Sequence, residues 1–282
     1  MQDNPRARAI PAIIVMLLLG GSLFARDVVT EVIVENDTLH QSETCIAVDQ
    51  QADSILMAAW NAEDPSPDIS YSIGWGFSFD GGTSWSTGLL EPVDSIHVNG
   101  GDPSCAFDES GYVYCCYVAY RMYPPPPSSQ LYVARTDIFD ADWDYFYVDQ
   151  GAKGTDRPYM TIDNTGGDFN DRIYTLWVGK WGGDLPAPKY DYMTIWRNYS
   201  TDHGESWSAG DSLRTVCRLD TIKPSGLNSP IPVVGNDGTL YAAWTAHYAD
   251  NTFDIEIKRS TNGGISFVSC TSITDLNGVE TP

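Results

Sequence analysis

The chain has 282 residues, of which 42% are hydrophobic, and its 16 Lys and Arg stand against 38 Asp and Glu, for a net charge of −22. This length and apolar content argue against a disordered chain and suffice for a sizeable core. The negative charge repels phosphate backbones, so nucleic acid is not expected as a partner. With 16 Tyr, 9 Trp, 25 Gly and 17 Pro, and no convincing amphipathic helix, the sequence favours many strands joined by tight turns.

Residues 1–25 have the layout of a secretory signal peptide. Arg6 and Arg8 precede an apolar run at 10–19, and small residues lead to a cleavage point after Ala25. The alternative is an N-terminal membrane anchor, for which the apolar run is short. We therefore expect an exported protein, extracellular, at the cell surface or periplasmic, without membrane contact after cleavage.

Removal of this leader would leave 14 basic and 37 acidic side chains. Such a surface suits an exported protein and is compatible with Ca²⁺ binding, although charge alone indicates no metal site. The mature chain would keep six cysteines, Cys45, Cys105, Cys115, Cys116, Cys217 and Cys270. Their spacing is not typical of zinc ligands, so we expect mostly buried thiols, with one disulfide as the alternative.

From residue 43 the chain repeats a two-strand unit four times. Each unit is an apolar strand, a polar turn and a second apolar strand that ends in an aromatic residue. The four pairs are ETCIAVD with ILMAAW, PSCAFD with VYCCY, PYMTID with IYTLW, and PIPVVGND with LYAAW. The equivalent aromatic residues are Trp60, Tyr117, Trp177 and Trp244. Their nearly continuous apolar character predicts strands buried on both faces, near the centre of an assembly.

A third strand of alternating polarity follows in each unit, most clearly FDIEIKRS at 253–260. It ends in the motif Ser-x-Asp-x-Gly-x-x-Trp, after which a fourth strand is expected. The motif is complete at Ser78, Asp80, Gly82 and Trp85 and at Ser200, Asp202, Gly204 and Trp207, and is weaker at Ser260, Asn262, Gly264 and Phe267. The second unit carries only a degenerate copy within 134–143.

Four antiparallel strands per unit, repeating every ~50–70 residues, predict an all-β fold, the β-propeller. The expected blades are 43–101, 102–155, 156–227 and 228–282. Pro103, Pro158 and Pro230 stand where inner strands begin, and Pro282, the last residue, stands where a fifth would begin. We therefore expect a propeller truncated at its C-terminus, with a complete four-bladed protein as the alternative. Residues 26–42 are then expected to supply the strand that completes the last blade and closes the ring.

The repeated motif resembles the Asp-box, or bacterial neuraminidase repeat, of the sialidase-like superfamily of β-propellers. The phrase GTDRPYMTID at 154–163 is also similar to the start of a blade in secreted members of this superfamily. The resemblance covers nearly all of residues 40–282. It implies the fold of a six-bladed family but does not fix an activity.

The resemblance also implies what a catalytic member needs. Sialidases are retaining glycosidases with a Tyr nucleophile, a Glu partner, an Asp acid/base and three arginines that bind the substrate carboxylate. The first arginine sits in an Arg-Ile-Pro-like phrase, and the nearest string here is RAIP at 8–11, inside the predicted leader. No other arginine falls in a matching context. We therefore expect a non-catalytic protein, with catalytic residues in missing blades as the alternative.

In sialidase-like propellers the ligand site lies on the face opposite the Asp-box turns. The blade starts and the loops between second and third strands are expected on that face. They offer the ligand-binding candidates Glu43, Asp102, Arg121, Tyr123, Asp156, Arg157, Trp181 and His247. Aromatic rings beside carboxylates suit stacking on a sugar and hydrogen bonding to its hydroxyls. The alternatives are an ion pair or turn cap for Asp156 and Arg157, and loop packing for Trp181.

Two acidic features have structural interpretations. The loop at 163–171, DNTGGDFND, offers oxygen ligands for Ca²⁺, but its spacing is not that of an EF-hand and an ordinary polar turn is favoured; no other cofactor is expected. Asp80 is expected to accept backbone N–H groups of its own turn, with Gly82 supplying a positive φ and Trp85 packing beneath. The Asp-boxes are therefore predicted to be hairpin clasps away from the ligand.

Three functions fit these observations. The first is a secreted propeller that binds a glycan or another extracellular ligand without catalysis. The second is a glycoside hydrolase of the sialidase type whose remaining catalytic residues lie in missing blades. The third is a structural or protein-interaction module of a larger surface protein. The missing arginine phrase favours the first.

Overall fold

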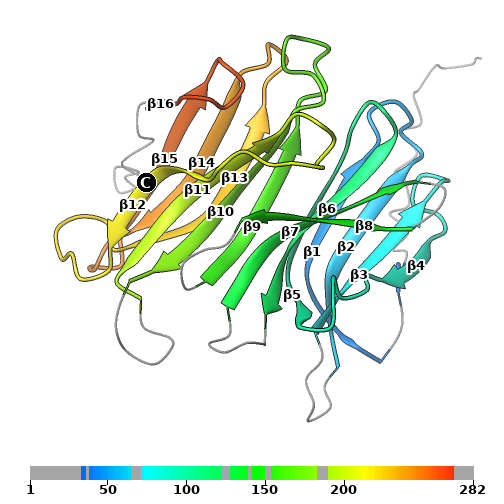
Figure 1. Ribbon diagram of the computed structural model, residues 1–282, viewed down its shortest axis with the longest axis horizontal. Helices are drawn as coiled ribbons and strands as arrows, with labels where there is room; N and C mark the ends of the chain where they lie inside the picture. Colours follow the sequence, from blue (N-terminus) through cyan, green and yellow to red (C-terminus); the bar gives the residue numbers. More distant parts are fainter. Residues whose placement is uncertain are drawn as a thin grey trace, which may run out of the picture. The chain divides into compact units, whose positions relative to one another are not determined.

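The computed structural model of the chain describes residues 33–35, 38–64, 71–121, 128–138, 142–149, 154–182 and 190–269 (Figure 1). The chain divides into two compact units, Met1–Glu31 and Val32–Pro282, and the predicted signal peptide lies in the first, outside the described residues. The regular secondary structure of the described residues is β-strand throughout. Within them, the structure contains no helix with the length and apolar character of a membrane span.

The sixteen strands form four antiparallel sheets of four strands each. In chain order they are β1 (His40–Val48), β2 (Leu56–Glu63), β3 (Tyr71–Ser78) and β4 (Ser86–Leu89); β5 (His97–Phe107), β6 (Tyr112–Arg121), β7 (Ser128–Asp137) and β8 (Asp144–Asp149); β9 (Gly154–Ile162), β10 (Ile173–Trp181), β11 (Tyr192–Ser200) and β12 (Asp211–Cys217); and β13 (Gly226–Val234), β14 (Leu240–His247), β15 (Phe253–Ser260) and β16 (Val268–Ser269).

Each sheet keeps the order of the chain from its inner to its outer strand. The inner strands β1, β5, β9 and β13 contact one another in succession, so the sheets follow each other as blades (Figure 1). This arrangement confirms the predicted all-β propeller of four-stranded blades. Of the predicted N-terminal strand at 26–42, residues 33–35 are not in a strand and 40–42 belong to β1, while residues 26–32 lie outside the described residues.

Most of the hydrophobic core lies between neighbouring blades, and one smaller cluster, Ala58, Trp60 and Ala62 with Val34, Leu39 and Trp85, lies on the first blade alone. One cluster spans each of the three seams between blades, and its members include Met57 with Tyr117, Val133 with Trp177, and Leu176 with Trp244. The repeated aromatic residues Trp60, Tyr117, Trp177 and Trp244 are 4%, 0%, 1% and 2% exposed. The second strands β2, β6 and β10 are therefore buried on both faces, as their continuous apolar runs predict, whereas β14 is fully buried only at alternate residues.

The first and fourth blades each have one face that no other described blade covers. Ile46 and Val48 of β1 are 64% and 48% exposed, and Ile231 and Val233 of β13 are 46% and 53% exposed. Ile46 and Val48 stand three and five positions after Glu43, whereas Ile231 and Val233 stand two and four positions after the equivalent Ser229. Because side chains alternate between the two faces of a strand, the two pairs lie on opposite faces of their sheets. The uncovered face of the fourth blade also explains why Phe253 of β15 is 54% exposed, although the alternating pattern of this strand predicts that it is half-buried.

The Asp-box of the first blade closes the hairpin between β3 and β4 by hydrogen bonds within its own turn. Asp80 accepts the backbone N–H of Ser84 at 2.8 Å and the Ser84 hydroxyl at 2.7 Å. Ser78 Oγ donates to Asp80 at 2.9 Å and accepts the N–H of Gly82 at 2.8 Å, and Trp85 Nε1 donates to the Gly82 carbonyl at 3.0 Å. Gly82 has a φ of 88°, which favours glycine.

The other two copies close the turn in a similar way, except that in the fourth blade Asn262 donates to the Ser266 hydroxyl and the Phe267 side chain has no N–H group to donate. In the third blade Ser200 donates to Asp202 at 2.7 Å, and Asp202 accepts the N–H of Ser206 at 2.9 Å. In the fourth blade Asn262 replaces the aspartate, accepting from the Ser260 hydroxyl at 2.8 Å and from the N–H of Ser266 at 3.0 Å. An amide oxygen can therefore hold this turn as a carboxylate does.

Replacing Asp80 by alanine should lower the melting temperature by a few degrees, because three donors of the turn lose their acceptor. The hydrogen bonds from Ser84 hold the pKa of this carboxyl down at about 2, so the clasp should persist at all but very acidic pH. Thermal unfolding followed by circular dichroism measures the effect. Asp80→Asn is the control and should stay close to the wild type, as Asn262 shows; equal melting temperatures for the alanine variant and the wild type would contradict the clasp.

Candidate ligand-binding site

The sheet register separates two ends of each blade. In the first blade the β1–β2 turn and the Asp-box lie at one end, because Leu56 pairs with both Val48 and Ser78. The other end carries the β2–β3 loop, where Glu63 pairs with His40 and Tyr71. The ends are therefore divided as the sequence predicts, with the Asp-boxes away from the β2–β3 loops.

The inner strands share an irregularity in the middle of each strand. Glu43, Asp102, Arg157 and Ser229 have φ values of 50°, 57°, 48° and 49°. At each of them the pairing of the inner strand with the second strand shifts register. Left-handed backbone at a non-glycine residue costs about 1–2 kcal/mol, and such strain gathers at functional sites. In each of the four blades, the bulge thus gives a polar side chain a direction that it would not have in a regular strand.

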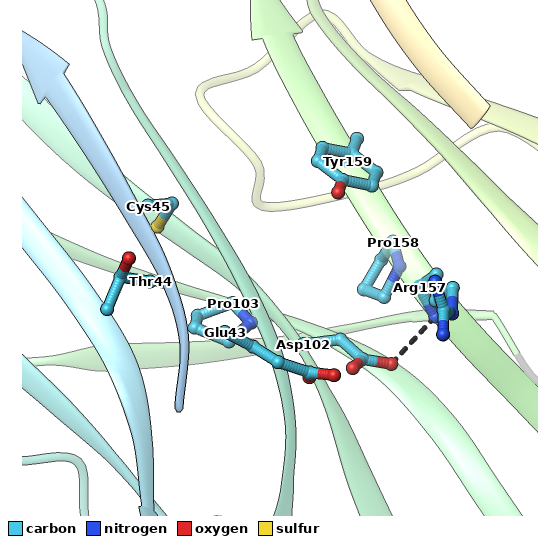
Figure 2. Close-up of a pocket in the computed structure, with 8 residues that line it drawn as sticks. All are labelled: Glu43, Thr44, Cys45, Asp102, Pro103, Arg157, Pro158 and Tyr159. Carbon is cyan, nitrogen blue, oxygen red and sulfur yellow. Dashed lines mark hydrogen bonds between the residues drawn. The ribbon is translucent and has the colours of Figure 1, made fainter. Parts of the chain in front are cut away.

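Three of these residues line one pocket of about 220 Å³ on the wall formed by the first three inner strands (Figure 2). Its lining consists of Glu43, Thr44, Cys45, Asp102, Pro103, Arg157, Pro158 and Tyr159. Each blade contributes a bulge residue and the residues that directly follow it, so the repeat itself generates the pocket. The structure places Glu43, Asp102 and Arg157 within the strands rather than at the strand starts, because the inner strands begin several residues earlier than the apolar runs suggest.

Asn61 of β2 holds the two acidic bulge residues together. Its side chain is buried, donates to Glu43 Oε2 at 2.9 Å, and accepts the backbone N–H of Asp102 at 3.0 Å. The neighbouring Gly101 leaves room for this contact, since a Cβ there would stand 3.1 Å from the Asn61 amide. The amide therefore fixes the first blade against the second beneath the pocket.

The carboxyl groups of Glu43 and Asp102 lie next to each other (Figure 2). A hydrogen bond between these two side chains shifts the pKa of both. Burial and the neighbouring Glu43 carboxyl together raise the pKa of Asp102 to about 7, while the hydrogen bond from Asp102 lowers the pKa of Glu43. The backbone N–H of Arg157 donates to Asp102 Oδ2 at 2.8 Å. Near neutral pH the pair holds one shared proton, with Asp102 as donor and Glu43 as acceptor.

A second pocket of about 340 Å³ adjoins Arg157 on the side of the fourth blade. Lys180 forms an ion pair with Asp156 and lies 5.7 Å from the centre of the Tyr190 ring. The Arg218 guanidinium lies 4.7 Å from the same ring. Positive charge is thus concentrated here, in a chain that is strongly acidic overall.

The predicted site residues divide into three groups. Glu43, Asp102 and Arg157 line the first pocket, and Asp156, Arg157 and His247 line the second. Burial lowers the pKa of His247, whose ring packs 4.6 Å from Phe253. Neither pocket includes the remaining described candidates, Arg121 and Trp181, and Tyr123 lies outside the described residues.

Trp181 and Arg121 stand at the ends of their strands. The Trp181 ring stacks on Tyr192 at 4.4 Å, and its Nε1 donates to Thr194 at 2.8 Å, which is packing within its own blade. Arg121 ends β6, where it pairs in register with His97 and Ser128. The loops that follow these two residues are not described, so their part in ligand binding stays a prediction.

Asn61, Lys180 and Arg218 also shape the site, although the sequence patterns did not single them out. A signal exists for Asn61, which directly follows the repeated Trp60 where the second and third repeats have Val118 and Val178. The fourth repeat has the polar Thr245 at this position, so the sequence distinguishes Asn61 only from the second and third repeats. Nothing comparable marks Lys180 or Arg218, whose place depends on how strands of different blades meet.

The described residues bring together no group of three or more His, Cys, Asp or Glu side chains that could hold a metal ion. The acidic loop 163–171 forms the turn between β9 and β10, at the Asp-box end. Within it Asp163 accepts the N–H of Thr165 at 3.1 Å and its hydroxyl at 2.6 Å, as in an ordinary polar turn. Ca²⁺ binding by this loop stays a prediction.

Replacing Asp102 by asparagine should change how stability depends on pH. The folded pKa of Asp102 lies above its ordinary value of 3.8, so the folded state binds more protons than the unfolded state between these values. Stability should therefore fall as pH rises from about 4 to about 7 and stay level above that. We expect a loss of about 1–2 kcal/mol over this range in the wild type, since solvent screens part of the interaction, and a smaller loss in Asp102→Asn.

Urea unfolding at about pH 5 and about pH 8 measures this difference. Asparagine tolerates the left-handed backbone of position 102, so the variant should fold. Asp168→Asn, which removes an exposed carboxyl in the β9–β10 turn of the third blade, is the matched control and should keep the wild-type dependence. Identical dependence in Asp102→Asn and the wild type would show that the proton is not shared at this pair.

No family model matches the chain, and no curated protein matches it in sequence. Solved structures do match. A Dyadobacter fermentans protein of unknown function has a TM-score of 0.56 at 16% identity, covering 84% of this chain and 70% of its own. A Hadza microbial sialidase has a TM-score of 0.56 at 13% identity, covering 82% and 46%. A thermostable family-43 glycoside hydrolase has a TM-score of 0.50 at 16% identity, covering 79% and 73%.

The chain spans slightly less than half the length of the microbial sialidase that it matches. At these identities the similarity shows the fold alone. The four antiparallel blades, the Asp-box hairpins and these structural neighbours agree with the resemblance found in the sequence. The chain therefore has the fold of the sialidase-like β-propellers.

Proposed function

We propose that the chain binds a glycan, without cleaving it, in the two adjoining pockets on the inner strands. The observation that carries this proposal is the repeated bulge: blades one to three each direct a polar residue from strained backbone into a single pocket. Strain of this kind gives no stability, so a binding role is the better reason for it. Sialidases and a glycoside hydrolase among the structural neighbours support a glycan as the ligand.

The two pockets offer complementary chemistry to a sugar. Glu43 and Asp102 together supply acceptors and one acidic proton, which suits a pair of vicinal hydroxyls. Arg157 stands between the pockets and, with Lys180 and Arg218, offers positive charge to an acidic substituent. Tyr190 adds an aromatic ring to the second pocket. A glycan that carries both free hydroxyls and a carboxylate fits this combination best.

A glycoside hydrolase is the second candidate, and one observation favours it. An acid with a pKa near 7 is suited to protonate a leaving group, as Asp102 would. However, in glycosidases that use a pair of carboxyls, unlike the sialidases with their Tyr nucleophile, the two groups stand about 5–5.5 Å apart in retaining enzymes and about 6.5–9.5 Å apart in inverting ones. Glu43 and Asp102 share a hydrogen bond and are closer than either, so they act as one proton-sharing unit and not as a catalytic pair.

Export remains part of the proposal. The leader-like residues 1–25 and the acidic composition support a protein that meets glycans outside the cytoplasm. In this view the chain would have no membrane contact once the leader is removed. Edman sequencing or mass spectrometry of the exported protein would show whether its N-terminus is Arg26.

The proposal is tested on a glycan array, followed by calorimetry with any glycan that binds. Glu43→Gln, Asp102→Asn and Arg157→Gln should each weaken binding about tenfold or more, since each removes a charged or shared hydrogen bond. Asp168→Asn is the matched control and should bind as the wild type does. A panel of fluorogenic glycosides, sialosides included, tests hydrolysis on the same samples.

Each outcome has a distinct meaning. Binding that falls in the three pocket variants and not in the control supports the proposal. Turnover of a glycoside supports the hydrolase instead. A folded protein that binds no glycan and cleaves none overturns both, and leaves a protein-interaction module as the function to pursue.

A further inference from the structure

Two cysteine side chains from neighbouring blades meet beside the first pocket. The Sγ atoms of Cys45 in β1 and Cys105 in β5 lie 3.3 Å apart, although the residues are 60 positions apart in sequence. A disulfide needs an S–S distance of about 2.05 Å, so the sulfur atoms must approach by only about 1 Å. Contact between the two strands already brings the residues together across the seam.

Cys45 is the thiol of this pair that a small molecule can reach. It is partly buried, lines the pocket that holds Glu43 and Asp102, and also lines an apolar pocket of about 500 Å³ against the first blade. By contrast Cys115 and Cys116 on β6 are completely buried. An oxidant that enters either pocket therefore meets Cys45 first.

The contact also makes the two thiols unequal. A hydrogen bond from Cys105 lowers the pKa of Cys45, and the same contact together with burial raises the pKa of Cys105. Since the thiolate is the nucleophile, Cys45 is suited to attack and Cys105 to follow. Cys45 would therefore be the attacking cysteine of the pair, and Cys105 the resolving cysteine.

We propose that Cys45 and Cys105 form an oxidisable dithiol that closes to a disulfide between the first and second blades. With oxidised glutathione, the Cys45 thiolate attacks one sulfur, forms a mixed disulfide and releases one glutathione thiolate. The Cys105 thiol then gives its proton to solvent and attacks Cys45 Sγ, and the second glutathione leaves as a thiolate. The two cysteines lose two electrons in total, and the glutathione disulfide gains them.

The disulfide would act on the seam that carries the first pocket. Glu43 lies two residues before Cys45, and Asp102 three residues before Cys105. A covalent link here closes a long loop and opposes separation of the two blades, so the oxidised protein should melt at a higher temperature than the reduced one. The dithiol itself does not depend on what the pocket binds.

The test uses the full chain, reduced and then freed of reductant. After incubation with oxidised glutathione, the protein is denatured, its free thiols are alkylated, and the labels are counted by mass spectrometry. We expect two fewer labels than in the reduced sample, a disulfide-linked peptide pair containing Cys45 and Cys105, and a higher melting temperature that dithiothreitol reverses. Cys217→Ser, the control, should keep this link.

Two variants keep the inference open to refutation. In Cys45→Ser, Cys105 should stay alkylatable after the same treatment, and oxidation should no longer raise the melting temperature. In Cys105→Ser, the first step should stop at a glutathione adduct on Cys45, which the mass identifies. Full labelling of the oxidised wild type, or a link from Cys105 to its cross-strand neighbour Cys115, would overturn the proposal.

Discussion

Replacing Trp177 by alanine is expected to lower the free energy of unfolding by about 3–5 kcal/mol, a large part of the stability of a domain. Trp177 is 1% exposed and belongs to the cluster between the second and third blades. Its ring stacks on Trp196 at 5.9 Å, and its Nε1 donates to Asn198 at 2.8 Å. The variant loses the buried ring, leaves a cavity and strands a buried amide oxygen.

Denaturant unfolding measures this loss, and Trp181→Ala provides the comparison within the same strand. Trp181 is only partly buried, so its removal should cost less, about 1–2 kcal/mol. Equal losses in the two variants would show that the seam between blades is not where the core energy resides.

The second large effect is expected at Asp108, a buried carboxylate in the turn between β5 and β6. Its oxygens accept from the N–H groups of Ser110 and Tyr112 at 2.9 Å each and from the Tyr114 hydroxyl at 2.7 Å. His203, from the Asp-box of the third blade, lies 3.1 Å away. Alanine at this position leaves all of these groups without their acceptor, and we expect a loss of about 3 kcal/mol or more.

The control for Asp108→Ala is Tyr114→Phe, which removes one donor and leaves the carboxylate with the others. It should cost about 1 kcal/mol. His203→Ala should fall between these two, because it cuts the contact between blades and leaves the turn intact. If Asp108→Ala were no worse than Tyr114→Phe, the carboxylate would not be the link between the turn and the neighbouring Asp-box.

The fold could be predicted because its information is local and repeated. Strands such as VYCCY and IYTLW are apolar throughout, and only a sheet covered on both faces satisfies them. The Asp-box could be interpreted because all of its partners lie within the motif, from Ser78 to Trp85. Repetition then turned these local patterns into blades.

The site could be predicted only in part, since it depends on contacts between blades. Proline spacing led to Asp102 and Arg157, but not to Asn61, whose role requires that β2 of one blade face β5 of the next. The contact between Cys45 and Cys105 was hidden for the same reason. Trp181 shows the converse: an aromatic residue at a loop suggests a ligand, while its stacking on Tyr192 is a property of the folded sheet.

The left-handed bulges have a consequence for how the surface of this protein can change over evolution. A position with φ near 50° strongly disfavours β-branched side chains but accepts polar side chains of different lengths. The bulges of the second and third blades are joined by a side chain, since Asp102 accepts the backbone N–H of Arg157. Glu43, Arg157 and Ser229 show that an acid, a base or a hydroxyl can stand at a bulge, whereas a change at Asp102 would also remove a contact with the third blade. The side chain at the bulge can therefore differ from blade to blade while the four-stranded scaffold stays the same.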